Sequence, residues 1–242
     1  MIPATVGAVV ALWMSPIPET TDASPRVVIT EIMYDPASRE TAGATEWVEI
    51  ANVGDAPIAI RNWRLDDEDR TSWGTFSVDL DPGEVAVLIN GRQVTAAEFR
   101  DAWDAADNTS PTALYPVLPV KWGGLANAPS VTNELLTLLD GSGRIVCHVN
   151  LHGDGHWPDG RDASVYLMHP ATSDPNDGSA WRRSEPGTDH ARSSRTSAIF
   201  NQIECGSPGV LPRLAEPRPG AEDTVSPPSS VAATDVDGVP VP

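Results

Sequence analysis

Short apolar runs bounded by turn residues recur along the first half of the chain. β-Branched residues are concentrated in these runs, and several alternate polar with apolar positions, so that Val48 and Ile50, for example, share one face of a strand. An Asp-Pro-Gly triplet at 81–83 is a turn signal between two of the runs. The pattern predicts five strands, at residues 26–34, 46–52, 57–65, 75–80 and 84–90.

The strand-like alternation of polar and apolar residues stops in the sequence TAAEFRDAWDA, residues 95–105. Thr95 and Glu98 have the spacing of a capping box, and Phe99 and Trp103 lie four residues apart, on one side of a helix. We therefore expect one short helix here, lying over a loop.

The second half of the chain contains a hairpin signal. Residues 133–139 and 144–151 are apolar runs joined by Asp-Gly-Ser-Gly, and residues 164–168 form one more strand-like run. Residues 106–130 are turn-rich and their pattern assigns no element, whereas residues 170–208 are expected to be a loop apart from the apolar run at 198–200. Within the hairpin, alternation predicts an inward face of Ile145, Cys147, Val149 and Leu151 and an outward face of His148, Asn150 and His152.

Composition agrees with many short strands. The chain of 242 residues is 40% hydrophobic, enough for a packed core, and its 23 prolines and 19 glycines favour turns over long helices. Such a length is compatible with one large all-β domain. Residues 214–242 lack aromatic residues and are rich in Pro, Ser, Asp and Glu, so they predict a disordered acidic tail.

The first 25 residues resemble a secretory signal. Their apolar run, residues 6–14, is too short to span a bilayer, and Thr21 and Ala23 could be the small residues before a cleavage site. The positive segment that usually precedes the apolar run is missing, so a disordered or loosely docked N-terminus is the alternative. No transmembrane segment is expected elsewhere in the chain.

Net charge restricts the partners. With 34 Asp and Glu against 16 Lys and Arg, the formal net charge of −18 would repel nucleic acids and anionic membranes. The same field would attract cations, Ca²⁺ included, and basic partners.

A series of motifs, in order along the chain, resembles the lamin tail domain family, especially its bacterial secreted members. Asn62 stands where the family usually has glycine. The matching segments are ITEIMYDP at 29–36, EWVEIAN at 46–52, NWRLDD at 62–67, LDPG at 80–83, GGLAN at 123–127, WP at 157–158 and GSPG at 206–209.

The resemblance implies an immunoglobulin-like β-sandwich over residues 26–213. Trp47 and Trp63 would fill its core, and Gly206 and Gly209 would allow unusual backbone angles in a closing loop. It implies an interaction or structural module, secreted, periplasmic or at the cell surface, rather than an enzyme. The partner would be a protein, a polysaccharide or a cation-bridged surface component, and no cofactor is expected.

Histidines offer an alternative of another class, a metal-dependent hydrolase or nuclease centred on residues 148–159. His148, His152 and His156 are the candidate ligands. Two side chains four residues apart on a strand are separated by about 13 Å, however, so a polar outer face is the favoured interpretation. The surroundings of a ββα-metal nuclease are absent from the sequence.

Acidic residues supply two further candidates. Glu31, Glu46 and Glu49 are carboxylates on predicted strands, where structural hydrogen bonding or exposure is favoured over acid–base catalysis. A loop of acids without EF-hand spacing could hold Ca²⁺ or could simply be solvated. The candidate ligands in this loop are Asp66, Asp67 and Asp69.

The chain has two cysteines and no Cys-x-x-Cys motif. Cys147 is on the predicted inward face and Cys205 in the closing loop. The hypothesis is a disulfide that fastens the C-terminal segment to the sandwich, adding about 2–4 kcal/mol. The alternative is two buried free thiols.

Overall fold

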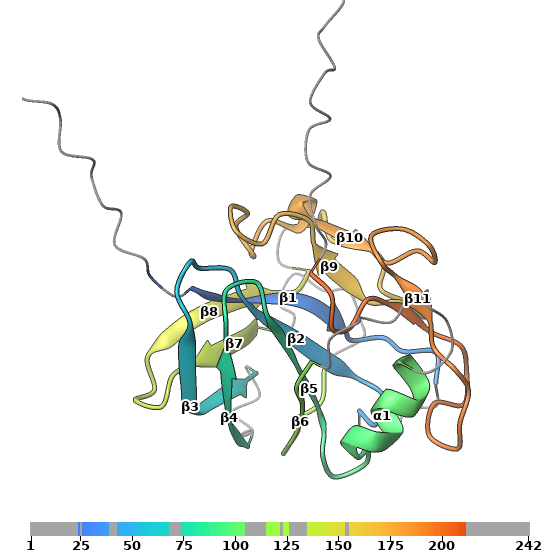
Figure 1. Ribbon diagram of the computed structural model, residues 1–242. Helices are drawn as coiled ribbons and strands as arrows, with labels where there is room; N and C mark the ends of the chain where they lie inside the picture. The colour runs from blue at the N-terminus through green and yellow to red at the C-terminus, as the bar shows by residue number, and fades with distance from the viewer. Residues whose placement is uncertain are drawn as a thin grey trace, which may run out of the picture. The chain divides into compact units, whose positions relative to one another are not determined.

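Two β-sheets pack against each other, and a helix and a long C-terminal segment cover the outer face of the larger one (Figure 1). The predicted all-β sandwich with one short helix is confirmed. All described residues belong to one compact unit, Met1–Pro212. The structure, a computed structural model, describes residues 24, 26–38, 43–67, 74–104, 115–121, 123–125, 135–152 and 155–211.

The larger sheet has the strand order β10-β9-β1-β2-β5-β6, antiparallel throughout except between β5 and β6. The smaller sheet, β4-β3-β7-β8, is antiparallel, and β11 and β12 form a separate ribbon. The strands are β1 (Val27–Met33), β2 (Trp47–Asn52), β3 (Ile58–Asp66), β4 (Thr75–Leu80), β5 (Val85–Asn90), β6 (Val117–Val120), β7 (Leu135–Leu139), β8 (Ile145–Asn150), β9 (Val165–Leu167), β10 (Trp181–Arg183), β11 (Arg192–Ser193) and β12 (Cys205–Gly206).

The main core lies between the two sheets. Val48 and Ile50 of β2 face it, as their alternation predicts, and meet residues such as Leu138 and Val149 from the smaller sheet. Burial of these side chains is the dominant favourable contribution to folding. The central strands β1, β2 and β5 are buried along their whole length, because a second apolar cluster covers their other face.

A bulge in β3 keeps its apolar residues on the core side. The register with β4 shifts between Ile60 and Trp63, so Trp63 and Leu65 continue to face the core although they are an odd number of residues from Ile60. Asn62 has a φ of 54°, in the left-handed region. Glycine is the usual residue for that conformation and asparagine is among the few others that tolerate it, which explains the departure from the family motif.

Helix α1 (Ala96–Trp103) packs on the larger sheet, not over a loop as expected. Thr95 and Glu98 form the predicted capping box. The side chain of Trp47 points away from the main core and needs its own apolar cover. Trp103 and Phe99 supply it, with ring centroids 5.7 Å and 6.2 Å from the Trp47 ring in edge-on geometry.

The hairpin of β7 and β8 confirms the prediction, with one difference. Cys147, Val149 and Leu151 are buried, but Ile145 is 60% exposed. Leu138 pairs with Cys147 and Leu139 with Ile145, so Val146 is an extra residue on β8, and the bulge turns Ile145 outward. His152 was expected on the outward face and is instead buried, with a φ of 62° after the strand ends.

Short strands lie in two turn-rich segments. β6 lies in residues 106–130, for which the sequence makes no assignment, and β10, β11 and β12, each of two or three residues, lie in residues 170–208, which were expected to be a loop. Strands this short carry too little alternation to be detected.

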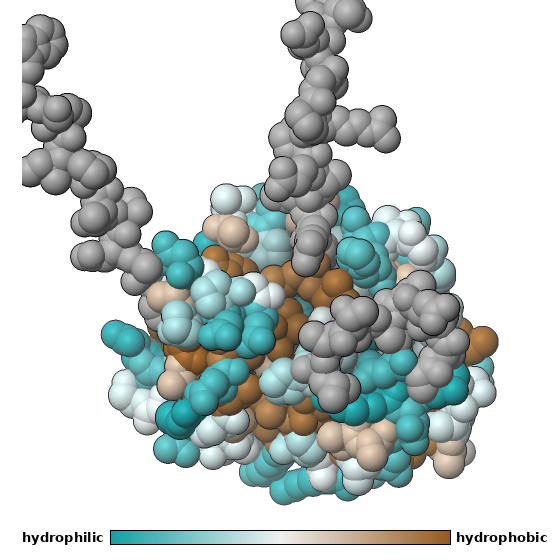
Figure 2. Space-filling view, in the orientation of Figure 1, coloured by the Kyte–Doolittle hydropathy of each residue, from teal (hydrophilic) through white to brown (hydrophobic). Residues whose placement is uncertain are grey.

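The predicted export signal and the predicted acidic tail lie outside the described residues, apart from Ser24. Within the described ranges, no helix has the length and apolar character needed to cross a membrane. The face of the molecule shown in Figure 2 is covered by polar side chains with apolar residues between them.

Candidate functional site, a buried carboxylate pair

Glu31 and Glu49 are directly opposite each other on the paired strands β1 and β2. They lie on the outer face of the larger sheet, since Trp47 and Ala51, two residues either side of Glu49, belong to the second apolar cluster. Their exposed fractions are 1% and 0%. Two carboxylates buried side by side are costly unless each is hydrogen-bonded and at least one of them holds a proton.

Hydroxyl and amide groups surround the Glu31 carboxylate. Ser207 donates to it twice, from its backbone amide at 2.8 Å and from its hydroxyl at 2.7 Å. The hydroxyl of Ser164 also donates to Glu31, and that of Ser184 lies 3.4 Å away. Ser164 directly precedes β9, Ser184 directly follows β10 and Ser207 directly follows β12. Glu31 therefore joins three distant parts of the chain.

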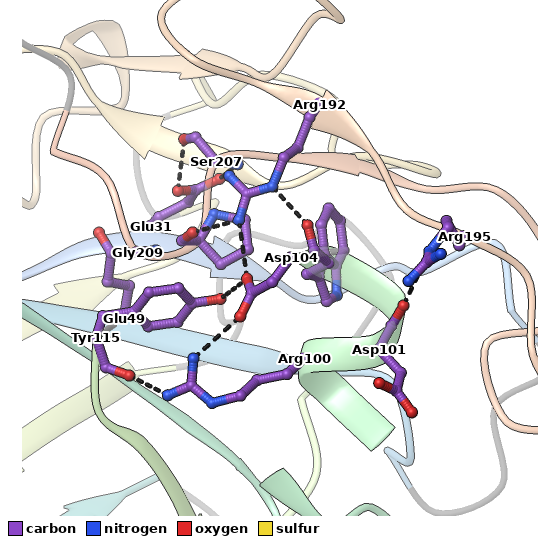
Figure 3. Close-up of polar contacts among 12 residues, drawn as sticks. Glu31, Glu49, Arg100, Asp101, Asp104, Tyr115, Arg192, Arg195, Ser207 and Gly209 are labelled. Carbon is purple, nitrogen blue, oxygen red and sulfur yellow. Dashed lines mark hydrogen bonds and ion pairs between the residues drawn. The ribbon is translucent and has the colours of Figure 1, made fainter. Parts of the chain in front are cut away.

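The Glu49 carboxylate makes fewer contacts. The hydroxyl of Thr30 donates to one oxygen at 2.8 Å, and the backbone amide of Gly209 donates to the other at 2.8 Å. Figure 3 shows both glutamates beneath the segment that carries Ser207 and Gly209. We call residues 205–209 the closing segment; the carboxylate pair holds it on the sheet.

Electrostatics set the protonation of the pair. Burial raises the pKa of Glu31, and hydrogen bonds from Ser164 and Ser207 oppose that rise. Burial raises the pKa of Glu49 well above its usual value, and the negative charge of Glu31 adds to the increase. The positive charge of Arg192 lowers both pKa values. Interacting carboxyls lose their protons in two steps, so Glu49 is the group that retains a proton to higher pH.

Arg192 connects the closing segment to the end of helix α1. It is 4% exposed; its Nε donates to the carbonyl of Trp103 at 2.7 Å, and Nη2 donates to the carbonyl of Pro208 at 2.7 Å. Nη2 also lies 3.5 Å from Oδ1 of Asp104, the residue that caps the helix C-terminus. A cation at this position satisfies one of the last carbonyls of the helix, that of Trp103, and complements the helix dipole.

Asp104 brings two more side chains to the cluster. Arg100 pairs with it at 3.0 Å, and the hydroxyl of Tyr115 donates to it at 2.8 Å. The guanidinium of Arg100 lies 4.9 Å from the centre of the Tyr115 ring, in cation–π geometry. Burial, followed by the charge of Asp104, raises the pKa of Tyr115 far above its usual value, so the phenol remains a hydrogen-bond donor.

Glycines allow the closing segment to approach the sheet. Gly209 has a φ of 88°, as predicted, and an added Cβ would lie 2.1 Å from the ring of Tyr115. Gly206 has no such angle, contrary to expectation; it is required because a Cβ there would lie 2.9 Å from Trp47. The carboxylates of Glu31 and Glu49 thus attach the closing segment to the larger sheet, and hydrogen-bond donors of the chain itself surround their oxygens.

The histidine candidates do not form a metal centre in the described residues, where no three metal-ligating side chains gather. His148 is exposed on β8 and His156 is exposed in the following loop. His152 packs edge-on against Tyr34 and Trp157, with ring centroids 5.2 Å and 6.3 Å away. His148 is exposed on β8, whereas His152 lies beyond the end of the strand, has a φ of 62° and is buried, so the two side chains do not share the outward face.

The acidic loop is described only in part. Asp66 ends β3 and pairs with Arg64 at 2.8 Å, and Asp67 follows it. Asp69 lies outside the described residues, so the predicted Ca²⁺ loop is not described as a whole. Glu46, the third carboxylate considered from sequence, accepts a hydrogen bond from the backbone amide of Leu125 at 3.0 Å. For Glu31, Glu46 and Glu49, the expected structural hydrogen bonding is observed.

The predicted disulfide is not formed in this structure, where both cysteines are free and buried. Cys147 faces the main core between the sheets, whereas Cys205 packs with Ala163 and Ala191 in a separate small cluster. Burial raises the pKa of both thiols, that of Cys205 to about 11. The closing segment is fastened by the carboxylates instead.

Arg192 was not singled out from the sequence. It is one of several arginines in a turn-rich stretch, and its two closest partners are backbone carbonyls, which leave no pattern in a sequence.

Comparison with known proteins identifies the family. The family model for the Lamin Tail Domain matches residues 20–152, more than half of the chain. No curated protein matched the chain. The match ends just after β8, so Ser164, Ser207 and Gly209, which complete the carboxylate site, lie beyond it.

Proposed function

The chain belongs to the Lamin Tail Domain family, an immunoglobulin-like β-sandwich family, and we propose that it acts as a non-catalytic interaction or structural module outside the cytoplasm. Fold alone does not define an activity, so the proposal depends on what the polar groups of this chain do.

One observation carries the proposal. The group of buried polar side chains around Glu31 and Glu49 makes its hydrogen bonds to distant parts of the same chain and holds them together. Hydrolytic sites keep an open coordination position or a nucleophile in reach of substrate. Here Glu31 and Glu49 are 1% and 0% exposed and accept hydrogen bonds from the chain itself, so no substrate can reach them. This supports a structural role for the pair over a catalytic one.

Charge and the N-terminal pattern support the location and the class of partner. The net charge of −18 disfavours nucleic acid and favours a protein or surface component. The apolar run at residues 6–14 supports export.

Catalysis is tested on the full chain after chelation and separate addition of Zn²⁺, Mn²⁺, Mg²⁺ or Ca²⁺. We expect no turnover of bis(p-nitrophenyl) phosphate or p-nitrophenyl acetate above buffer with any metal. Metal-dependent turnover that is lost in His148→Ala would overturn the proposal in favour of the hydrolase alternative. Thermal unfolding of the same samples reports metal binding independently, because a ligand of the folded state raises the melting temperature.

Export is tested by fusing alkaline phosphatase, an enzyme that is active only outside the bacterial cytoplasm, to the C-terminus of the full chain. The matched control lacks residues 1–25. We expect activity from the full chain alone; equal, low activity from both fusions would place the protein inside the cell.

A further inference from the structure

A groove on the sandwich has room for a small ligand. It has a volume of about 500 Å³ and lies where β1, β3 and β8 meet the loop between β9 and the short 3-10 helix at Gly178–Ala180. Sites for small ligands occupy about 300–1,000 Å³ and combine an apolar wall with a few oriented polar groups. The side chains of this groove therefore indicate which ligand it suits.

The groove is electrically neutral, although the chain carries a net charge of −18. Its charged side chains are those of Arg26, Arg144 and Asp174, with His148 counted as neutral. Asp140 pairs with Arg144 at 3.0 Å, so the two acids balance the two arginines. The negative field of the chain repels anions, and the groove has no uncompensated charge that would hold an ion of either sign. These charges suit a neutral ligand.

Two polar side chains in the loop wall are held in fixed orientations. Asn176 accepts a hydrogen bond from the backbone amide of Asn150 at 3.1 Å. Its own backbone and side-chain amides donate to Oδ1 of Asp174 at 2.9 Å and 3.3 Å. Within the described part of the chain, these contacts leave Oδ2 of Asp174 as an acceptor and the second N–H of the Asn176 amide as a donor. Groups that the fold already orients lose little entropy when they bind a ligand.

Arg26 and His148 add further hydrogen-bonding capacity. One guanidinium N–H of Arg26 donates to the carbonyl of Ala171, and a guanidinium has five such groups. A neutral imidazole supplies one donor and one acceptor. The groove thus presents donors and acceptors together. This combination suits hydroxyl groups, because each hydroxyl both donates and accepts.

The remaining wall is apolar. Ile58, Trp63 and Val146 line the groove and are partly buried against the main core. An aromatic ring offers a flat face with partial negative charge, on which the C–H groups of a sugar ring pack. A neutral sugar has the two properties that match this groove, a flat apolar face and a rim of hydroxyls.

We propose that the groove binds a neutral oligosaccharide, one sugar ring of which packs against Trp63 while its hydroxyls bond to Asp174 and Asn176. An extended peptide suits the site less well, because Asn176 already takes the backbone amide of Asn150 at the end of β8. The inference rests on the proposed function as an interaction module and names the class of surface component that it binds.

Isothermal titration calorimetry of the full chain tests binding with four neutral tetrasaccharides: chitotetraose, cellotetraose, maltotetraose and mannotetraose. We expect at least one to bind with a dissociation constant of about 1 mM or less. Asp174→Asn keeps an acceptor for Asn176 but removes the free carboxylate oxygen. It should weaken binding by at least about tenfold, because hydrogen bonds to charged groups are the stronger ones.

The matched control is Asp177→Asn. It makes the same change in charge in the same loop, at a side chain that does not line the groove, and keeps the Oδ1 acceptor for Ser179. Binding should stay within about twofold of the wild type, since a single exposed charge outside the site is largely screened.

Trp63→Leu tests the apolar wall. Leucine can still pack against the main core, but it lacks the flat ring and should weaken binding by at least about tenfold. Circular dichroism melting checks that each variant is folded. The comparison of Asp174→Asn with Asp177→Asn decides the question if Trp63→Leu does not fold.

Absence of binding by all four tetrasaccharides would overturn the inference, and so would binding that Asp174→Asn or a folded Trp63→Leu leaves unchanged. Equal or tighter binding of tetragalacturonate would also overturn it, because an anionic sugar contradicts the neutral groove. Chromatography of the sugars after incubation separates this result from the proposed function. Cleavage of a bound tetrasaccharide would contradict the non-catalytic function and leave the binding site in place, and the export assay is independent of both.

Discussion

Replacing Glu49 measures how strongly the carboxylate pair holds the closing segment. Glu49→Ala leaves the hydroxyl of Thr30 and the amide of Gly209 without their acceptor. An unsatisfied buried donor costs about 1–3 kcal/mol, which gives about 2–6 kcal/mol for two. The Thr30 hydroxyl also lies 3.4 Å from the backbone carbonyl of Glu49 and can turn to it, so the lower half of that range is expected.

Glu49→Gln separates hydrogen bonding from charge. The amide carbonyl can still accept from Gly209, and its NH₂ group can donate to the oxygen of Thr30, so we expect a cost of about 1 kcal/mol or less near pH 5. At that pH the wild-type carboxyl is protonated in the folded state, because burial and then the charge of Glu31 raise its pKa.

The two proteins should differ in their dependence on pH. A carboxyl whose folded pKa is raised contributes stability that is fully present below its unfolded pKa. That contribution is lost as pH rises through the folded pKa, because the unfolded state releases its proton first. The wild type should therefore lose stability relative to Glu49→Gln as the pH rises above 4.5, the usual glutamate value, and through the raised pKa of the folded carboxyl.

Urea unfolding of the full chain, followed by tryptophan fluorescence at constant ionic strength, measures these differences. The Trp47–Trp103 contact at 5.7 Å lies beside the site and should report its loss. The difference in free energy of unfolding between wild type and Glu49→Gln cancels the titration of groups that do not interact with Glu49, so it reports the titration of the Glu31–Glu49 pair. A difference that is flat with pH, or that grows in favour of the wild type, would refute the protonation argument. A cost below about 1 kcal/mol for Glu49→Ala would refute the fastening.

Two further predictions concern packing and thiols. Gly209→Ala forces a Cβ against the Tyr115 ring at a φ of 88° and should lower the free energy of unfolding by about 2 kcal/mol or more. The control Gly187→Ala, at a φ of 82° with open space around it, should lower it by about 1 kcal/mol. Equal losses in urea unfolding would show that the close approach to Tyr115 is unimportant. Thiol labelling of unfolded, unreduced protein should modify both Cys147 and Cys205, and a lack of labelling that reduction reverses would restore the disulfide hypothesis.

The sequence predicts the fold best where alternation is long enough to define a face. The strands of residues 26–90 and the β7–β8 hairpin agree with their patterns, and the capping box at Thr95 locates the helix. The pattern fails where an extra residue intervenes: at Val146 a bulge reverses the direction of Ile145, and no local signal announces it. The short strands β10, β11 and β12 depend on tertiary contacts instead of periodicity.

The site is predictable only in part. Both carboxylates are visible in the sequence, on strands that the family motifs align, and the sequence favours either structural hydrogen bonding or exposure over catalysis; it does not predict their burial. Their mutual position depends on the register of β1 against β2, which shifts by one residue at the bulge between Ile29 and Glu31. Apart from Thr30, the donors come from positions more than 130 residues away, and a serine or a backbone amide carries no signal of such a contact.

The carboxylate pair also bears on where the folding unit ends. The family match stops at residue 152. A chain that ended there would expose Trp47 on the outer face of β1 and β2, and Glu31 and Glu49 would lose the hydrogen bonds that Ser207 and Gly209 donate. Residues 191–211 cover that face, and Arg192 joins it to the helix. We infer that this chain needs residues up to at least Gly209 to complete its sandwich. Glu31 and Glu49 then specify where the last segment docks, since each mispositioned donor would leave a buried charge unsatisfied.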